Sequence, residues 1–139
     1  MKVETTRFGQ LEIPVEGEYL FPLGLLGLEE LRRFCLVPHP GGAALQWLQS
    51  MESADVAFPV CDPRRFVADY HVALKISELT PLALSTLEEA QVLAILRVPA
   101  KPDKPTLNLL GPLILNPARR LGMQYVVNSG RWTSRHEIG

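Results

Sequence analysis

The chain has 139 residues, and its 14 Lys and Arg against 15 Asp and Glu leave a formal net charge of -1. That balance removes the simplest argument for direct nucleic-acid binding, which needs a basic footprint, and no apolar stretch reaches the roughly 20 residues of a membrane-spanning helix. The chain starts with polar and charged residues, where a signal peptide would place an apolar run. We therefore expect one soluble, cytoplasmic protein that contacts neither nucleic acid directly nor a membrane.

Short extended segments separated by Pro and Gly occupy the first part of the chain. Val3 and Leu11 lie on either side of a turn signal at residues 8–10, which predicts a hairpin. Residues 34–37 form a further extended apolar run, and Pro38 closes it. These segments favour a sheet-based architecture over a helix bundle.

The middle of the chain predicts a second hairpin and a long alternating strand. Residues 43–50 and 56–61 are two candidate strands joined by a polar connection. Apolar residues stand at every second position of residues 70–76, which is the period of a strand with one buried face. Residues 77–86 contain cap-like Ser and Thr and a Pro suited to a first turn, so they can hold one short helix.

The last third predicts one central strand and two further extended runs. Residues 91–98 are almost continuously apolar, as expected of a strand that is buried on both faces. Residues 106–116 and 123–128 are also extended in pattern, and the polar residues 129–139 are expected to fray.

Eight or nine short strands indicate a mainly β fold. We predict a small antiparallel β-barrel-like or sandwich domain with one or two short helices. The predicted organisation is a single domain over residues 1–130, followed by a polar C-terminal tail over residues 131–139.

The sequence contains few candidate catalytic residues. Cys35 and Cys61 are expected to be reduced and buried, because a cytosolic protein rarely keeps a disulfide. His39, His71 and His136 have neither zinc-ligand spacing nor a nearby nucleophile and are expected to be surface residues. We therefore predict a protein without catalytic residues, metal ligands or cofactor-binding residues.

Two arginine doublets and two tryptophans remain as candidate contact residues. Arg64-Arg65 and Arg119-Arg120 lack interleaved aromatic residues, so they make a weak nucleic-acid footprint but suit the rim of an interface with an acidic partner. Trp47 is expected in the core, whereas Trp132 lies in a polar segment and is the better candidate for an interface residue.

Several segments occur in an order and spacing that resemble one bacterial family. They are Phe21-Pro22-Leu23-Gly24-Leu25-Leu26-Gly27-Leu28-Glu29, Leu48-Gln49-Ser50, Ala57-Phe58-Pro59-Val60, Asp62-Pro63, and Asn108-Leu109 with Pro112, Ile114 and Asn116, followed by Gln124. This pattern is similar to that of the FliW family of flagellar assembly factors and covers about residues 3 to 128. Five ordered matches over a single-domain length make coincidence improbable.

The resemblance implies a small β-barrel-like fold and a regulatory role without catalysis. It implies two protein partners bound in turn: flagellin, and the translational regulator CsrA. While flagellin holds the factor, CsrA represses flagellin mRNA; when flagellin is secreted, the released factor captures CsrA and relieves repression. The family's antagonism is described as allosteric, which means a coupling free energy between two sites on CsrA. The chain is expected to be a monomer when free.

The predicted partner-binding residues come from these matched segments. They are Gln49, Ser50, Asn108, Leu109, Pro112 and Asn116. A polar group inside an apolar run must either satisfy buried backbone or face a partner, and both readings stay open for Gln49, Ser50 and Asn108.

Two other functions remain as alternatives. The first is a small-molecule-binding or enzymatic β-barrel with a pocket near Cys61, His71 and Asn108. The second is direct RNA binding through the arginine doublets. Family members are often acidic, which suits a basic partner, whereas this chain is close to neutral, so we expect weaker electrostatic steering toward CsrA.

Overall fold

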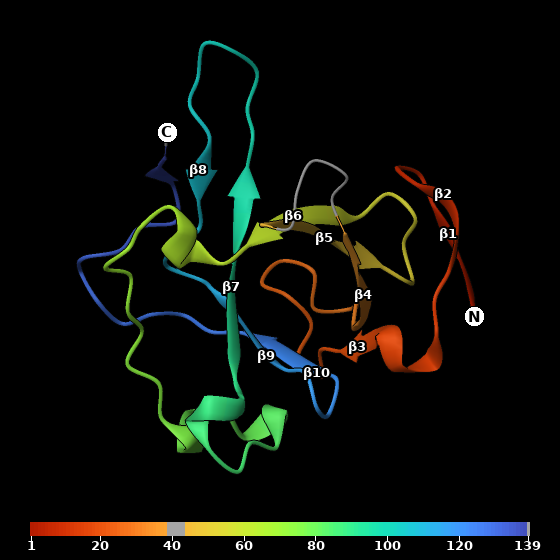
Figure 1. Cartoon of the computed structure of the whole chain (residues 1–139), viewed down its shortest axis with the longest axis horizontal. Helices are drawn as coiled ribbons and strands as arrows, with labels where there is room; N and C mark the ends of the chain where they lie inside the picture. Colours follow the sequence, from red (N-terminus) through yellow and green to blue (C-terminus); the bar gives the residue numbers. More distant parts are fainter. Residues whose placement is uncertain (39–43, 139) are drawn as a thin grey trace.

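Within residues 1–38 and 44–138, which the computed structural model describes, seven strands close into a barrel. The barrel strands are β3 (Glu18–Leu20), β4 (Arg33–Pro38), β5 (Leu45–Ser50), β6 (Ala57–Cys61), β7 (Gln91–Arg97), β9 (Leu113–Asn116) and β10 (Leu121–Gln124). Neighbours pair antiparallel except β10 and β3, which pair in parallel, and the β7–β9 pairing completes the ring. Closure gives each barrel strand a partner on both sides, which limits the exposed sheet edges that favour aggregation. The prediction of a mainly β, barrel-like fold is confirmed (Figure 1).

A two-stranded hairpin lies beside the barrel. Strand β1 (Lys2–Thr5) pairs with β2 (Gly9–Glu12), with Val3 opposite Leu11. Gly9 turns the chain at φ 69°, and the Thr5 hydroxyl donates to the Gly9 carbonyl oxygen over 2.7 Å. The predicted hairpin is therefore present, and its turn rests on the conformational freedom of glycine.

Two short strands extend the sheet beyond β7. Strand β8 (Thr106–Leu107) pairs with β7 on one side and with β11 (His136–Glu137) on the other. The long connection between β7 and β8 projects from one end of the molecule, and the C-terminus lies next to β8 (Figure 1). The extended run predicted over residues 106–116 is thus divided into β8 and β9.

The helical content consists of single turns. In the described part of the chain these are the 3-10 helices η1 (Val15–Gly17), η2 (Pro63–Arg65), η3 (Ile76–Glu78), η4 (Thr80–Leu82) and η5 (Leu87–Glu89). The helix predicted within residues 77–86 corresponds to η3 and η4, which end after one turn each; Ala83 follows η4 in a left-handed conformation. Across residues 1–38 and 44–138, no helix has the length and apolarity needed to cross a membrane.

The strand predicted at residues 70–76 is absent. The interpretation of this segment's alternating apolar and polar residues as a strand is therefore wrong. The alternation of burial is real: Tyr70 is buried and Val72 is half-buried, whereas His71 and Ala73 are exposed. No strand within the described ranges 1–38 and 44–138 pairs with this segment. Side chains alternate between buried and exposed wherever an extended segment lies against a core. The pattern therefore predicts which face is buried, but not whether a neighbouring strand forms backbone hydrogen bonds with the segment.

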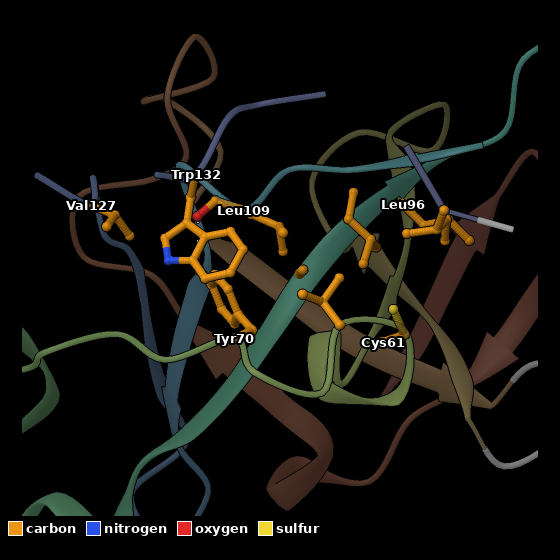
Figure 2. Close-up of a cluster of buried hydrophobic side chains, with 10 residues drawn as sticks. Cys61, Tyr70, Leu96, Leu109, Val127 and Trp132 are labelled. Atoms are coloured by element: carbon orange, nitrogen blue, oxygen red, sulfur yellow. Dashed lines mark hydrogen bonds between the residues drawn. The ribbon is translucent and has the colours of Figure 1, made fainter. Parts of the chain in front are cut away.

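The C-terminal segment does not fray as expected but packs against the barrel. The Trp132 side chain is only 7% exposed and contacts the Tyr70 ring edge-on, with centroids 4.9 Å apart. Ile138 is also buried, and β11 holds the segment to β8. Figure 2 shows Trp132 beside Tyr70, Leu109 and Val127. Trp132 is therefore a core residue, because its ring packs into a buried apolar cluster. The polar residues around it in the sequence gave no sign of this cluster.

The barrel interior holds a second apolar cluster. Phe21 and Phe34 meet edge-on with centroids 5.2 Å apart, and Leu48 and Leu115 pack around them. Gly122 lies against this pair, since a Cβ placed there would be 2.5 Å from the Phe21 ring. Both cysteines are free and buried, as predicted.

Candidate partner-binding surface

Gln49 and Ser50, at the end of β5, shape the turn that leads to β6. The Ser50 hydroxyl oxygen accepts from the backbone N–H groups of Glu52 and Ser53 over 3.1 and 2.9 Å. The Gln49 side-chain amide donates to the carbonyl oxygens of Ser50 and Val56 over 2.9 and 3.2 Å. Both side chains are fully buried. Both side chains form hydrogen bonds with backbone groups of the turn. Of the two predicted roles, bonding to buried backbone or facing a partner, the structure shows the first.

Asn116, Leu109 and Pro112 are also buried and hold neighbouring segments in place. The Asn116 amide donates to the Leu82 carbonyl oxygen over 2.8 Å and so ties β9 to η4. The Leu109 carbonyl oxygen accepts from the Tyr70 hydroxyl over 2.8 Å. In the described conformation these side chains offer no surface to a partner, so the geometry does not support a direct contact for them.

Asn108 differs from the other five predicted residues because it is only half-buried. Its Oδ1 accepts from the Gly111 N–H over 2.8 Å, and its side chain lines a shallow surface hollow of about 160 Å³. The hollow, here called the leucine hollow, is lined by Leu26, Asn108, Leu110, Gly111, Val126 and Ser134. Of the predicted residues, Asn108 is thus the one that the structure places at a candidate docking surface.

The leucine hollow presents apolar side chains to solvent on a fixed backbone. Leu26 is 63% exposed and Val126 is 54% exposed. The Leu26 N–H donates to Gln124 Oε1 over 3.0 Å, and Gln124 Nε2 donates to the Gly111 carbonyl oxygen over 2.9 Å. One side chain from β10 therefore joins the two loops that form the hollow.

Gly24 determines the path of the loop that carries Leu26. Its φ is 66°, and a Cβ at this position would lie 2.6 Å from the backbone of Glu29. Leu25, buried next to it, forms an isolated bridge with Leu28. The backbone path after residue 24 therefore directs Leu25 into the core and Leu26 toward solvent. Only a glycine at residue 24 allows this path without strain.

Sequence reasoning missed Leu26, Val126 and Gln124 as surface-forming residues. Leucine and valine in apolar segments are ordinarily core residues, and no residue pattern marks these two as exposed. Gln124, a polar residue that follows an apolar run, was the available signal, because such a group needs partners.

The two buried cysteines are poor nucleophiles, and the described residues form no metal-binding cluster. Burial raises the pKa of the Cys35 and Cys61 thiols to about 11, which keeps both protonated and weakly nucleophilic. Across residues 1–38 and 44–138, no group of three or more His, Cys, Asp or Glu could hold a metal ion. His39 lies outside the described residues.

The structure does not bring Cys61, His71 and Asn108 together around any of the four hollows described for residues 1–38 and 44–138. Cys61 is buried in the core cluster of Figure 2. His71 lines two hollows near Val72, and Asn108 lines the leucine hollow, which contains neither of the other two residues. These positions do not support a common site for the three side chains.

Comparisons with known proteins agree over nearly the whole length of the chain. The model of the family described as "FliW protein" matches residues 2–138. The chain is 34% identical over 139 residues to "Flagellar assembly factor FliW" of Natranaerobius thermophilus, covering 99% of this chain and 92% of that one. It is 38% identical over 138 residues to the protein of the same name from Syntrophotalea carbinolica, covering 99% and 97%. A crystal structure of the flagellar assembly factor FliW superimposes with a TM-score of 0.89 at 25% identity, covering 99% of this chain and 96% of that one. The chain therefore belongs to the FliW family of flagellar assembly factors.

Proposed function

We propose that this flagellar assembly factor binds flagellin and, when flagellin releases it, captures CsrA and so relieves repression of flagellin synthesis. It acts by protein binding, without catalysis, in the cytoplasm and as a monomer when free. Family membership over residues 2–138 supports the assembly role. The two partners follow from the family resemblance.

The observation that favours protein binding is the exposure of Leu26 and Val126 on a preorganised surface. Exposed apolar side chains that border a hollow are typical of interaction sites. The bonds of Gln124 to Leu26 and Gly111 order both loops before any partner arrives. Less conformational entropy is then lost on binding, and more of the contact free energy remains as affinity.

The regulatory cycle requires the two partners to be coupled. Flagellin must lower the affinity of the factor for CsrA, and linkage requires CsrA to lower its affinity for flagellin by the same ratio. A tenfold effect corresponds to about 1.4 kcal/mol of coupling. Because the net charge is only -1, shape and apolar contact carry more of the CsrA affinity than long-range attraction does.

Titration calorimetry with purified flagellin and CsrA tests this function. We expect the wild-type chain to bind each protein at micromolar concentration or below, and each to weaken binding of the other. The double variant Leu26→Ser, Val126→Ser is expected to lose about tenfold or more in affinity for at least one partner, since two apolar contacts are removed.

The matched control is Val15→Ser, because Val15 is 78% exposed in η1 and lies outside the leucine hollow. It should bind both partners as the wild type does. Absence of a complex with either protein would refute the proposed function. A mobility-shift assay with flagellin leader RNA and this chain alone should show no complex; a shift would favour direct RNA binding instead.

A further inference from the structure

The barrel wall opens between β6 and β7. These strands pair only at Val60 with Ile95 and Cys61 with Ala94 in the described part of the chain. The preceding residues of β6 remain paired with β5, as Trp47 opposite Pro59 shows. At the same level β7 pairs with β8 on its other edge, with Leu96 opposite Leu107. The two strands therefore diverge just beyond Ile95.

Pro59 accounts for this divergence. The Ser50 N–H donates to the carbonyl oxygen of Val56, just before β6. Counting from Val56, every second residue, Phe58 and Val60, directs its backbone groups to β5, and the residues between them direct theirs to β7. On β7, the Ile95 carbonyl oxygen accepts from Asn108, which turns the groups of Leu96 toward β6. Pro59 is thus the residue whose N–H would meet Leu96, and proline has none.

A groove of about 650 Å³ occupies the opening. It is lined by Arg7, Leu45, Trp47, Ala57, Phe58, Pro59, Ile95, Leu96, Arg97 and Val98. The lining comes from both diverging strands, and Val98 is 67% exposed at the lip. The groove walls are apolar and lie along a strand edge, a combination that peptide-binding domains use to add a strand.

The charge of the groove lining has one sign. Arg7 and Arg97 line it together with no carboxylate. The Arg7 guanidinium lies 4.0 Å from the centroid of the Trp47 ring. Neither arginine forms an ion pair with another residue of segments 1–38 and 44–138. The groove therefore complements an apolar segment that also carries carboxylates.

We propose that the groove between β6 and β7 binds an extended, carboxylate-bearing apolar segment of flagellin, which adds as a strand alongside Leu96 and Val98. This rests on the proposed function, since it places one of the two partners. Alternate side chains of the added strand enter the apolar groove, and a carboxylate reaches Arg97. CsrA suits this groove less, because a protein that binds mRNA needs a basic surface, which two arginines repel.

Calorimetry with full-length flagellin and CsrA, against two groove variants, tests the proposal. Arg97→Glu reverses the rim charge and Val98→Asp places a charge at the exposed lip; neither side chain is in the core. Each should weaken flagellin binding about tenfold or more and leave CsrA affinity within about twofold. The loss in Arg97→Glu should shrink as salt is raised, because salt screens the altered charge.

Two exposed positions outside the groove provide matched controls. Arg65→Glu makes the same charge change in η2, and Val15→Asp makes the same apolar-to-acidic change in η1. Both should bind flagellin as the wild type does. Hydrogen exchange supplies a direct readout: the amides of Leu96 and Val98 should gain protection in the flagellin complex.

Each result decides a different claim. If flagellin does not bind the wild-type chain, both the proposed function and the groove assignment fail. If flagellin binds but the groove variants match their controls and the two amides gain no protection, only the groove assignment fails. If Arg97→Glu weakens CsrA as much as flagellin, the assignment of the groove to flagellin is overturned.

Discussion

The backbone N–H of Leu26 donates a 3.0 Å hydrogen bond to the Oε1 atom of Gln124, which lies 98 residues later in the chain. The same amide group donates through Nε2 to the carbonyl oxygen of Gly111. A single side chain thus fixes two loops that line the leucine hollow. The exposure of Leu26 is a consequence of tertiary structure, because its backbone is held by a residue of β10.

Gln124→Ala should loosen the leucine hollow and destabilise the protein. The change removes both hydrogen bonds, and we expect the free energy of unfolding to fall by about 1–3 kcal/mol. Urea denaturation measures the loss, and hydrogen exchange at Leu26 should accelerate. The control is Gln91→Ala, an exposed position on β7, which should change stability by less than about 0.5 kcal/mol. Equal effects of the two variants would remove the structural role given to Gln124.

Gly24→Ala and Gly27→Ala form a matched pair in the loop that carries Leu26. Both glycines have positive φ, 66° and 83°, so each alanine variant loses about 1–2 kcal/mol to backbone strain. Gly27 faces open space, whereas a Cβ at residue 24 would lie 2.6 Å from Glu29 backbone atoms. We expect Gly24→Ala to lose at least about 1 kcal/mol more. Denaturation midpoints that rank the variants the other way would contradict this loop geometry.

Cys35 and Cys61 should be inert to thiol reagents in the folded protein. Burial raises the pKa of each thiol to about 11, so little thiolate exists near pH 8. Ellman's reagent should label both cysteines rapidly in denaturant and slowly in buffer. Rapid labelling of the native chain would show that these residues are accessible.

The same shifts predict loss of stability at alkaline pH. The folded pKa of about 11 exceeds the ordinary value of 9.0 for both thiols, so the unfolded state releases their protons first. The stabilising contribution is complete below about pH 9 and is lost as pH rises through the folded value. Urea titrations from about pH 8 to 11 should show this decline. It should be weaker in a variant with both cysteines replaced by alanine, and an equal decline would assign it to other groups.

Trp132→Ala should be strongly destabilising even though Trp132 lies near the C-terminus. The ring is buried against Tyr70, and large aromatic truncations in a core cost about 3–5 kcal/mol. Thermal or urea unfolding measures the change, with exposed Val126→Ala as the control that should stay near wild type. A loss below about 1 kcal/mol would restore the original expectation that the segment frays.

Local sequence signals predicted those elements whose partners lie nearby in the chain. The β1–β2 hairpin needs a turn residue such as Gly9 and a few alternating positions, all within residues 2–12. The hairpin of β5 and β6 is similar, and both predictions are confirmed. Residues 70–76 show the limit of the method: their alternation revealed which side chains are covered, but pairing depends on a second strand that no local pattern can supply.

The sequence by itself determined the family, the mainly β fold and the need of Gln49, Ser50 and Asn108 for hydrogen-bond partners. Only the tertiary structure decided that all three bond to backbone groups of the protein itself, and that Gln49 and Ser50 are buried whereas Asn108 is half-exposed. The same holds for the exposure of Leu26 and the burial of Trp132. The physical reason is that burial and hydrogen bonding depend on which distant segments meet, and barrel closure brings together residues as far apart as Leu26 and Gln124.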